Sequence, residues 1–218
     1  EDGSYTLFTP ISASRFMLPY WNPYRKDGSL ASEKDGSWAG TGSNPIEWME
    51  NNPYTNKKYK ILNVLYVELK PIKNLTWRSQ LGIDFTHSTS FMQSFPSYAG
   101  NNNDGVAGRG TQESTNLTIT NTANYQFKPV FFFSLTVMLG QEGINFNREG
   151  FSVTTRGQNN DFLTDLSSGT RATSWSSNGT SYGYLSFFGR GEYSYNDKYY
   201  LDFALRADAS SRFGKNNR

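Results

Sequence analysis

The chain has 218 residues and a formal net charge of +2, and hydrophobic residues make up 36% of it. Because the charge is close to balance and Lys and Arg form no stripe, the sequence argues against a nucleic-acid partner. The absence of cysteine excludes a disulfide scaffold and a thiolate metal site, and no run of about 18 apolar residues predicts a transmembrane helix.

Aromatic residues account for 16% of the chain, and it contains 20 Gly. This composition favours an all-β chain with long polar loops. A membrane β-barrel is compatible with the modest apolar content, because each of its strands is apolar on one side only.

Residues 1–56 are predicted to be mostly loop, because prolines and Asp-Gly pairs recur in them. Tyr5 and Leu7 fit the end of a strand that begins earlier. The aromatic content of this loop argues against disorder. Five aromatic residues in it are candidate contacts for a ligand or a partner protein, with packing of the loop onto its neighbours as the alternative: Tyr20, Trp21, Tyr24, Trp38 and Trp48.

Three β-hairpins are predicted after this loop, because apolar and polar residues alternate with a period of two over long runs. In each predicted strand the apolar residues stand mainly at odd numbers, as Leu201, Phe203 and Leu205 do. The predicted hairpins cover residues 57–88, 114–143 and 182–210.

The register of the hairpins follows from this parity. Since both strands of a hairpin are apolar at odd numbers, facing residues must sum to an even number, which requires a turn of odd length. Three-residue turns at residues 196–198 and 128–130 then pair Tyr195 with Tyr199, Phe187 with Ala207, and Phe127 with Phe131.

Short and long connections alternate along the chain, with long loops expected at residues 87–113 and 144–181. In an up-and-down sheet this places all short turns at one edge, as in bacterial outer-membrane barrels. The predicted strands of roughly 11–14 residues suit a tilted membrane strand better than a soluble domain. Aromatic residues near the short turns fit a membrane-interface girdle.

The even positions of these strands carry charge and are predicted to face a polar lumen. Paired carboxylates can suggest glycoside hydrolysis, and Glu192 is expected opposite Asp202. Arg190 and Arg206 lie nearby on a flat wall, which favours cross-strand charge balance over catalysis. The predicted lumen-facing residues are Arg78, Asp84, Arg190, Glu192, Asp202, Arg206 and Asp208.

No catalytic, metal or cofactor site is predicted. His87 is the only histidine, and one His without Cys predicts a surface residue and no metal site. Residues 101–105 resemble the start of a Ca²⁺ loop, but Gln112 stands where the twelfth-position Glu would be.

Three segments resemble the SusC/RagA-like TonB-dependent outer-membrane transporters: LSFFGR at residues 185–190, YSYNDKY at 193–199 and LRADASSRFG at 205–214. Ala209 departs from the Gly that the family usually has there. Residues 19–30, with Pro-Tyr, Asn-Pro-Tyr and Asp-Gly-Ser-Leu, also resemble a loop of this family.

The resemblance implies an all-β, up-and-down antiparallel transmembrane β-barrel with long extracellular loops, of which this chain supplies about six strands out of 22. It implies an outer membrane of a Gram-negative, Bacteroidota-like cell, with membrane lipid around the barrel. It also implies import of oligosaccharides or peptides into the periplasm, driven by TonB, together with a SusD-like surface lipoprotein. No plug domain or TonB box is recognised in the chain, so we expect it to be a piece of a longer protein.

A soluble all-β carbohydrate-binding module that uses the loop tryptophans is the alternative hypothesis. It predicts strands of about 5–6 residues and a two-sheet core. An enzyme is a weaker hypothesis still, because the sequence shows no nucleophile, base or metal constellation.

Overall fold

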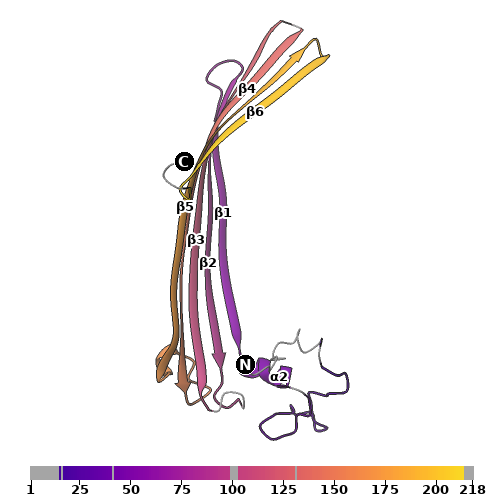
Figure 1. Ribbon diagram of the computed structural model, residues 1–218, viewed down its shortest axis with the longest axis vertical. Helices are drawn as coiled ribbons and strands as arrows, with labels where there is room; N and C mark the ends of the chain where they lie inside the picture. The colour runs from indigo at the N-terminus through magenta and orange to yellow at the C-terminus, as the bar shows by residue number, and fades with distance from the viewer. Residues whose placement is uncertain (1–14, 16, 41, 99–102, 131, 214–218) are drawn as a thin grey trace. The chain divides into compact units, whose positions relative to one another are not determined.

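The computed structural model describes residues 15, 17–40, 42–98, 103–130 and 132–213 of the chain, without the side chains of residues 128–130. Within residues 17–213, as far as they are described, the order is one α-helix and six β-strands, with a short 3-10 helix between the fourth and fifth strands (Figure 1). No helix among the described residues is long and apolar enough to cross a membrane. The elements are α2 (Pro45–Asn51), β1 (Tyr54–Leu69), β2 (Leu75–Ser94), β3 (Gly105–Val130), β4 (Phe133–Gln158), η2 (Leu166–Ser168), β5 (Arg171–Tyr195) and β6 (Tyr199–Ser210).

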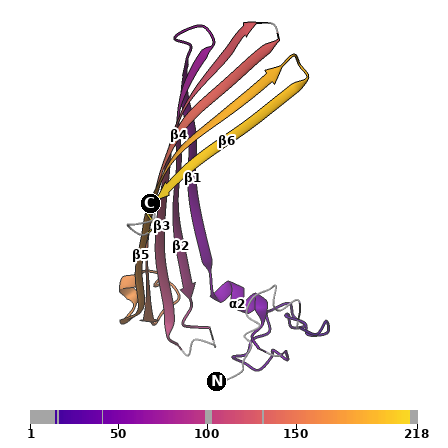
Figure 2. The ribbon, with the colours of Figure 1, turned by 45° about the horizontal axis from the view of Figure 1, so that its top comes forward.

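The six strands form one sheet in the order β1-β2-β3-β4-β5-β6, so every strand pairs with its neighbour in sequence (Figures 1 and 2). This is the up-and-down antiparallel arrangement expected from the sequence. The strands have 12 to 26 residues, far longer than the strands of the soluble-module hypothesis, and they form a single sheet. The fold therefore disfavours that hypothesis.

The chain divides into two compact units, which are described separately. The first contains α2, the loop before it, and residues 88–111 and 151–177. The second contains residues 58–87, 112–150 and 178–213, and with them the short turns.

The β5–β6 hairpin has the register that the parity of its apolar residues predicts. Tyr195 pairs with Tyr199, and Phe187 pairs with Ala207. Asn196 and Asp197 in the turn have φ angles of 53° and 50°, in the left-handed region that Asn and Asp tolerate better than most residues. The prediction for this hairpin is confirmed.

The turn between β3 and β4 differs from its prediction. β3 continues through Pro129 to Val130 and β4 begins at Phe133, so the connection is residues 131–132 instead of 128–130. The predicted pair of Phe127 with Phe131 lies outside the described residues. The odd–odd parity is nevertheless supported, because the side chain of Asn121 donates to that of Gln141 at 2.9 Å.

The long loops expected at residues 87–113 and 144–181 are mostly strand, and this is a correction. β2 and β3 are joined by residues 95–104, and β4 and β5 by residues 159–170. The missed strand segments have no regular apolar side, so the sequence shows no alternation there. Pairing with neighbouring strands keeps them extended all the same. Each of the three hairpins is therefore longer than predicted, while short and longer connections still alternate.

A second correction concerns residues 1–56, where α2 interrupts the expected loop. Asn44 caps the helix by accepting a hydrogen bond from the Ile46 amide at 3.1 Å, and Pro45 follows at the first helical position. The expected strand end at Tyr5 and Leu7 lies outside the described residues.

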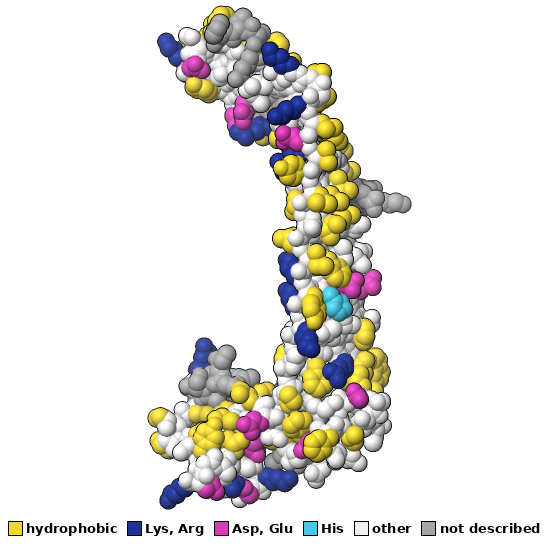
Figure 3. All heavy atoms as spheres, turned by 180° about the vertical axis from the view of Figure 1, so that it is seen from behind, with side chains coloured by type: hydrophobic (Ala, Val, Ile, Leu, Met, Phe, Trp, Pro, Cys, Tyr) yellow, Lys and Arg dark blue, Asp and Glu magenta, His cyan; other side chains and the backbone are white. Residues whose placement is uncertain are grey.

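Most apolar side chains of the sheet are not in a core. All the buried hydrophobic residues among the described ones belong to the first unit, and Trp38 and Tyr98 are the largest of them. In the second unit Leu201 and Leu205 are 63% and 76% exposed. Figure 3 shows hydrophobic side chains spread over the surface of the strands. The sheet thus presents an apolar side to its surroundings.

Candidate functional site

The polar side of the β5–β6 hairpin carries a first ion-pair network, centred on Arg190. Its Nη2 atom lies 2.6 Å from Asp202 Oδ2 and 3.0 Å from Glu192 Oε1. Glu192 and Asp202 face each other across the two strands, as predicted. Because one guanidinium binds both carboxylates, the arrangement fits charge balance on a polar wall and not a pair of catalytic acids.

Arg206 forms a second network on the same side of the sheet. Its Nε atom donates to Asp208 at 2.7 Å, and its Nη2 atom donates to Glu142 at 3.1 Å and to the buried Ser186 hydroxyl at 2.9 Å. The guanidinium also lies 5.5 Å from the centre of the Phe188 ring. This network connects β4, β5 and β6.

Arg78 and Asp84 lie on β2 and make separate contacts with β1. The Arg78 guanidinium stacks on the Tyr66 ring at 4.1 Å and donates to Gln80. Asp84 pairs with Lys60 at 3.0 Å. These five side chains extend the polar side of the sheet toward β1, since all stand at even positions of strands with alternating faces.

An aromatic group on β4 and β5 adds to this polar side. The rings of Phe146 and Tyr182 stack with centres 4.7 Å apart, and Tyr184 meets Tyr182 edge-on at 5.3 Å. Arg212 lies over Tyr182 at 4.3 Å and donates to Thr180. Aromatic faces and guanidinium groups are suited to contact sugar rings or peptide groups.

In the first unit, the loop before α2 is organised by Asn44. This side chain is fully buried, and its amide donates to the carbonyls of Pro23 and Ala31 at 2.8 and 2.7 Å. With the helix cap at Ile46, it joins three segments of the loop. A buried polar group with all these bonds holds one loop conformation, because losing any partner would leave a buried dipole unpaired.

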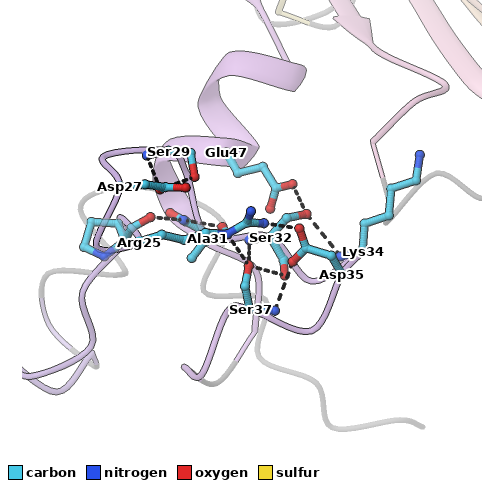
Figure 4. Close-up of polar contacts among 11 residues, drawn as sticks. Arg25, Asp27, Ser29, Ala31, Ser32, Lys34, Asp35, Ser37 and Glu47 are labelled. Atoms are coloured by element: carbon cyan, nitrogen blue, oxygen red, sulfur yellow. Dashed lines mark hydrogen bonds and ion pairs between the residues drawn. The ribbon is translucent and has the colours of Figure 1, made fainter.

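Two aspartates close turns in the same loop (Figure 4). Hydrogen bonds from Ser29 lower the pKa of the Asp27 carboxyl, and hydrogen bonds from Ser37 lower that of Asp35. Arg25 also pairs with Asp35. These contacts stabilise the turns only while the carboxyl groups are ionised.

The aromatic residues of the loop divide between its interior and its surface. Trp38 is 8% exposed and its indole N–H donates to the Gly42 carbonyl at 2.6 Å. Trp21 packs edge-on against Trp38 and also meets Tyr20. Tyr20 is 74% exposed. An exposed aromatic ring that is held in place by packed aromatic neighbours can bind a partner or a ligand.

Near this loop, burial raises the pKa of the Tyr98 hydroxyl, and the negative charges of Glu33 and Glu47 raise it further. Glu47 accepts a hydrogen bond from Ser32 (Figure 4), and the Lys34 ammonium reaches the Ser97 carbonyl at 3.2 Å. The loop before α2 is thus attached to the connection between β2 and β3.

Comparison with known proteins gives a consistent result. SusC of Bacteroides thetaiotaomicron, a TonB-dependent receptor, is 30% identical over 147 residues, which make up 67% of this chain and 14% of that protein. The solved structure of the RagAB peptide transporter matches 99% of this chain and 25% of its own, with a TM-score of 0.82 and 27% identity. The RagAB peptide importer in the "open-open" state matches 93% of this chain and 23% of its own, with a TM-score of 0.79 and 29% identity. No protein-family model matches the chain.

This chain is a SusC/RagA-like fragment. The resemblance that residues 185–214 indicate in the sequence is therefore confirmed, and so is the all-β antiparallel fold. The SusC/RagA-like chain spans 14% of its curated relative and 25% of the RagAB chain. The activity of the whole protein is therefore a proposal that goes beyond this segment.

The predicted lumen-facing residues of the SusC/RagA-like chain are brought together in part. Five of the seven lie in the two networks around Arg190 and Arg206, whereas Arg78 and Asp84 contact β1. That these residues face a lumen stays a prediction.

The five predicted loop contacts are placed differently from one another. Tyr20 and Tyr24 are exposed, Trp21 and Trp48 are half-buried, and Trp38 is buried, which fits the packing alternative for that residue. Whether the exposed ones bind anything stays a prediction.

The aromatic group of Phe146 and Tyr182 was not predicted from the sequence, because residues 144–181 read as a loop. Its signal is the even numbering that Phe146, Tyr182 and Tyr184 share with the charged side of β5. Within the described ranges, no three His, Cys, Asp or Glu side chains are grouped so that they could hold a metal ion.

Proposed function

We propose that the chain is part of the barrel wall of a TonB-dependent outer-membrane transporter. The observation that carries this proposal is the two-sided character of long strands, apolar and exposed on one side and ion-paired on the other. Leu201 and Leu205 exemplify the first side, and Arg190 with Asp202 exemplifies the second. Exposure of apolar side chains is unfavourable in water and favourable in lipid, whereas charged side chains are unfavourable in lipid and suit an aqueous lumen.

The connections of the sheet then have an inside and an outside. The short turn at Asn196 and Asp197 faces the periplasm, and the loop before α2 lies on the extracellular side. This follows from the usual asymmetry of bacterial barrels, with short periplasmic turns and longer extracellular loops.

The whole protein, in this proposal, imports oligosaccharides or peptides into the periplasm using energy that TonB delivers to regions outside this segment. The likeness to the RagAB peptide transporter supports peptides as a substrate class, and the resemblance to the SusC/RagA-like family adds oligosaccharides as the other class. A SusD-like lipoprotein covers the extracellular side, where exposed Tyr20 and Tyr24 provide contacts for it or for the substrate. The networks around Arg190 and Arg206 form lumen wall, and no chemical step is assigned to them.

The orientation can be tested by cysteine labelling, because this segment contains no native cysteine. Tyr20→Cys and Asp197→Cys are introduced separately into the full-length protein, and intact cells are treated with a membrane-impermeant maleimide. In cells from which the surface lipoprotein has been deleted, so that it cannot shield position 20, Tyr20→Cys should be labelled without permeabilisation, and Asp197→Cys only after the outer membrane is permeabilised. Equal labelling of both positions on intact cells would refute the proposed orientation.

Transport is tested in a strain that lacks the full-length protein. Uptake of labelled oligosaccharides and of labelled peptides is compared with that of the complemented strain, and co-purification of a surface lipoprotein is measured. Loss of uptake of one substrate class would support the proposal and identify the class. Unchanged uptake of both classes would count against import as the function.

A further inference from the structure

The first unit contains an open cavity of about 440 Å³ between the ends of β1, β2 and β3 and Phe151 of β4. Two cationic side chains line it, Lys57 and Arg109, together with the rings of Phe91 and Phe151. The proposed transport function does not require two cationic side chains beside aromatic rings at this place.

The two cations are positioned differently. The Arg109 guanidinium lies 3.9 Å from the centre of the Phe91 ring, which orients its plane. The carboxylate nearest to it is that of Asp165, whose Oδ1 atom is 3.9 Å from Nη2. The Asp165 side chain is 78% exposed and that of Arg109 is 43% exposed. Lys57 has no carboxylate within ion-pair distance among the residues that the structure describes. The cavity therefore keeps an excess of positive charge.

Hydroxyl groups supply neutral donors beside the cations. Thr89 and Thr111 line the cavity and make no side-chain hydrogen bond to another described residue. An Arg fork, a Lys ammonium and nearby hydroxyls are the donors that proteins use to bind phosphate groups. The aromatic rings provide flat apolar walls, which suit the faces of a sugar.

The strand periodicity indicates where such a ligand comes from. Side chains two residues apart in a strand point to the same side, so Lys57 shares its side of β1 with the exposed Tyr59 and Ile61. These two belong to the apolar side that the proposed function assigns to lipid. Cations that follow an apolar stretch on the lipid side of a membrane protein lie at headgroup level, where they bind anionic headgroups.

We propose that the cavity at Lys57 and Arg109 binds the phosphate of a phosphorylated sugar headgroup of an outer-leaflet membrane lipid. The inference rests on the proposed function, since it needs the strands to cross the outer membrane. It assigns a lipid site to a surface separate from the polar side of the sheet.

The test uses the full-length protein reconstituted into nanodiscs, whose incorporation by itself reports whether the protein is an integral membrane protein. Nanodiscs contain phosphatidylcholine with either lipid A or dephosphorylated lipid A, and bound lipid is measured by native mass spectrometry. The double variant Lys57→Ala/Arg109→Ala is compared with wild type. Lys58→Ala is the matched control, because Lys58 points to the opposite side of β1. Arg109→Lys keeps the charge and removes the fork.

Wild type and Lys58→Ala should retain lipid A in preference to its dephosphorylated form. The double variant should lose this preference, with lipid A binding weakened about tenfold or more, since two charge-assisted contacts are removed. Arg109→Lys should lie between the two. Equal binding by wild type and the double variant overturns the proposal.

Free inorganic phosphate and glucosamine 1-phosphate are added in a separate arm to distinguish a lipid from a soluble ligand. Weak competition at millimolar concentrations supports the lipid as ligand. Complete displacement of lipid A at micromolar concentrations would overturn the assignment to a lipid in favour of a soluble phosphorylated solute. Failure of the protein to enter nanodiscs would instead refute the proposed function.

Discussion

Asn44 is the residue on which the loop before α2 depends most. Replacing it with Ala removes the helix cap at Ile46 and the buried donor to the Ala31 carbonyl, whereas the Pro23 carbonyl keeps its hydrogen bond from the Ala31 amide. We expect Asn44→Ala to lower the local stability of the loop by about 2–4 kcal/mol. Hydrogen exchange of the loop in the full-length protein should then be roughly 30- to 700-fold faster.

Asn44→Asp is the matched control for this prediction. It keeps an oxygen that accepts from Ile46 and loses the two donors to the carbonyls. Hydrogen exchange in the first turn of α2 should be slower in Asn44→Asp than in Asn44→Ala. Near Pro23 the two variants should exchange at similar rates. Unchanged exchange in Asn44→Ala would show that the loop is held by other contacts.

The same loop is expected to open in acid. Because the pKa values of Asp27 and Asp35 are lowered in the folded loop from their ordinary value of 3.8, folding favours their ionised form. Their stabilising contribution is present above pH 3.8 and is lost as the pH falls through the lowered values. The tryptophan fluorescence of the protein should change below this pH as Trp21 and Trp38 separate.

The double variant Asp27→Asn/Asp35→Asn tests the cause of this change. Asn cannot lose a proton, so the variant should start less stable and show a smaller fluorescence change over the same pH range. Identical acid transitions in the variant and in wild type would assign the titration to other groups.

At the scale of elements, the sequence predicts which side of a strand each residue faces better than it predicts how long the strand is. The register of β5 and β6 follows from the odd-numbered apolar residues of both strands, such as Phe187 and Leu201, together with the three-residue turn between them. Residues 171–181 contain no such alternation, yet they are strand, because pairing in a continuous sheet does not require an apolar side. The sequence therefore locates the part of each strand that has a regular apolar side and misses the part beyond it.

Side-chain groups were harder to predict than strands. Glu192 and Asp202 lie in paired strands of one hairpin, so their contact is readable from the register. Phe146 and Tyr182 lie in strands that are joined by residues 159–170. The alternation of apolar residues does not predict the length of this connection, so it does not predict their contact. The helix at Pro45 was readable in principle from the Asn-Pro pair that begins it, but the surrounding prolines obscured that signal.

The β5–β6 turn gives a test of register. Deleting Lys198 leaves a two-residue turn, which slips β6 by one position and exchanges its apolar and polar sides. We expect the full-length variant to fail to assemble in the outer membrane, measured by surface abundance and by the heat-dependent gel shift of folded barrels.

Asp197→Gly is the control for the turn, because it keeps the turn length and suits the φ of 50° at this position. It should assemble as well as wild type, with stability unchanged or raised by up to about 1 kcal/mol. If the Lys198 deletion assembled as well as Asp197→Gly, register would not be fixed by the alternation of β6.

For the molecule as a whole, the decisive question is what surrounds its apolar side. Ile119 on the central strand β3 is 42% exposed, and the adjacent Thr118 points to the polar side beside Gly82. If lipid surrounds the apolar side, Ile119→Arg should destabilise the folded full-length protein by about 2–4 kcal/mol near the bilayer midplane, while Thr118→Arg faces water and should cost much less.

The measurement is urea unfolding of both variants in lipid vesicles. An exposed Ile→Arg change in a water-soluble protein usually alters the free energy of unfolding by no more than about 0.5 kcal/mol. A large difference between the variants therefore requires a lipid environment on one side of β3 and water on the other. Two equally stable variants would mean that the apolar side faces water or another protein, and the assignment of this sheet to a membrane wall would then be wrong.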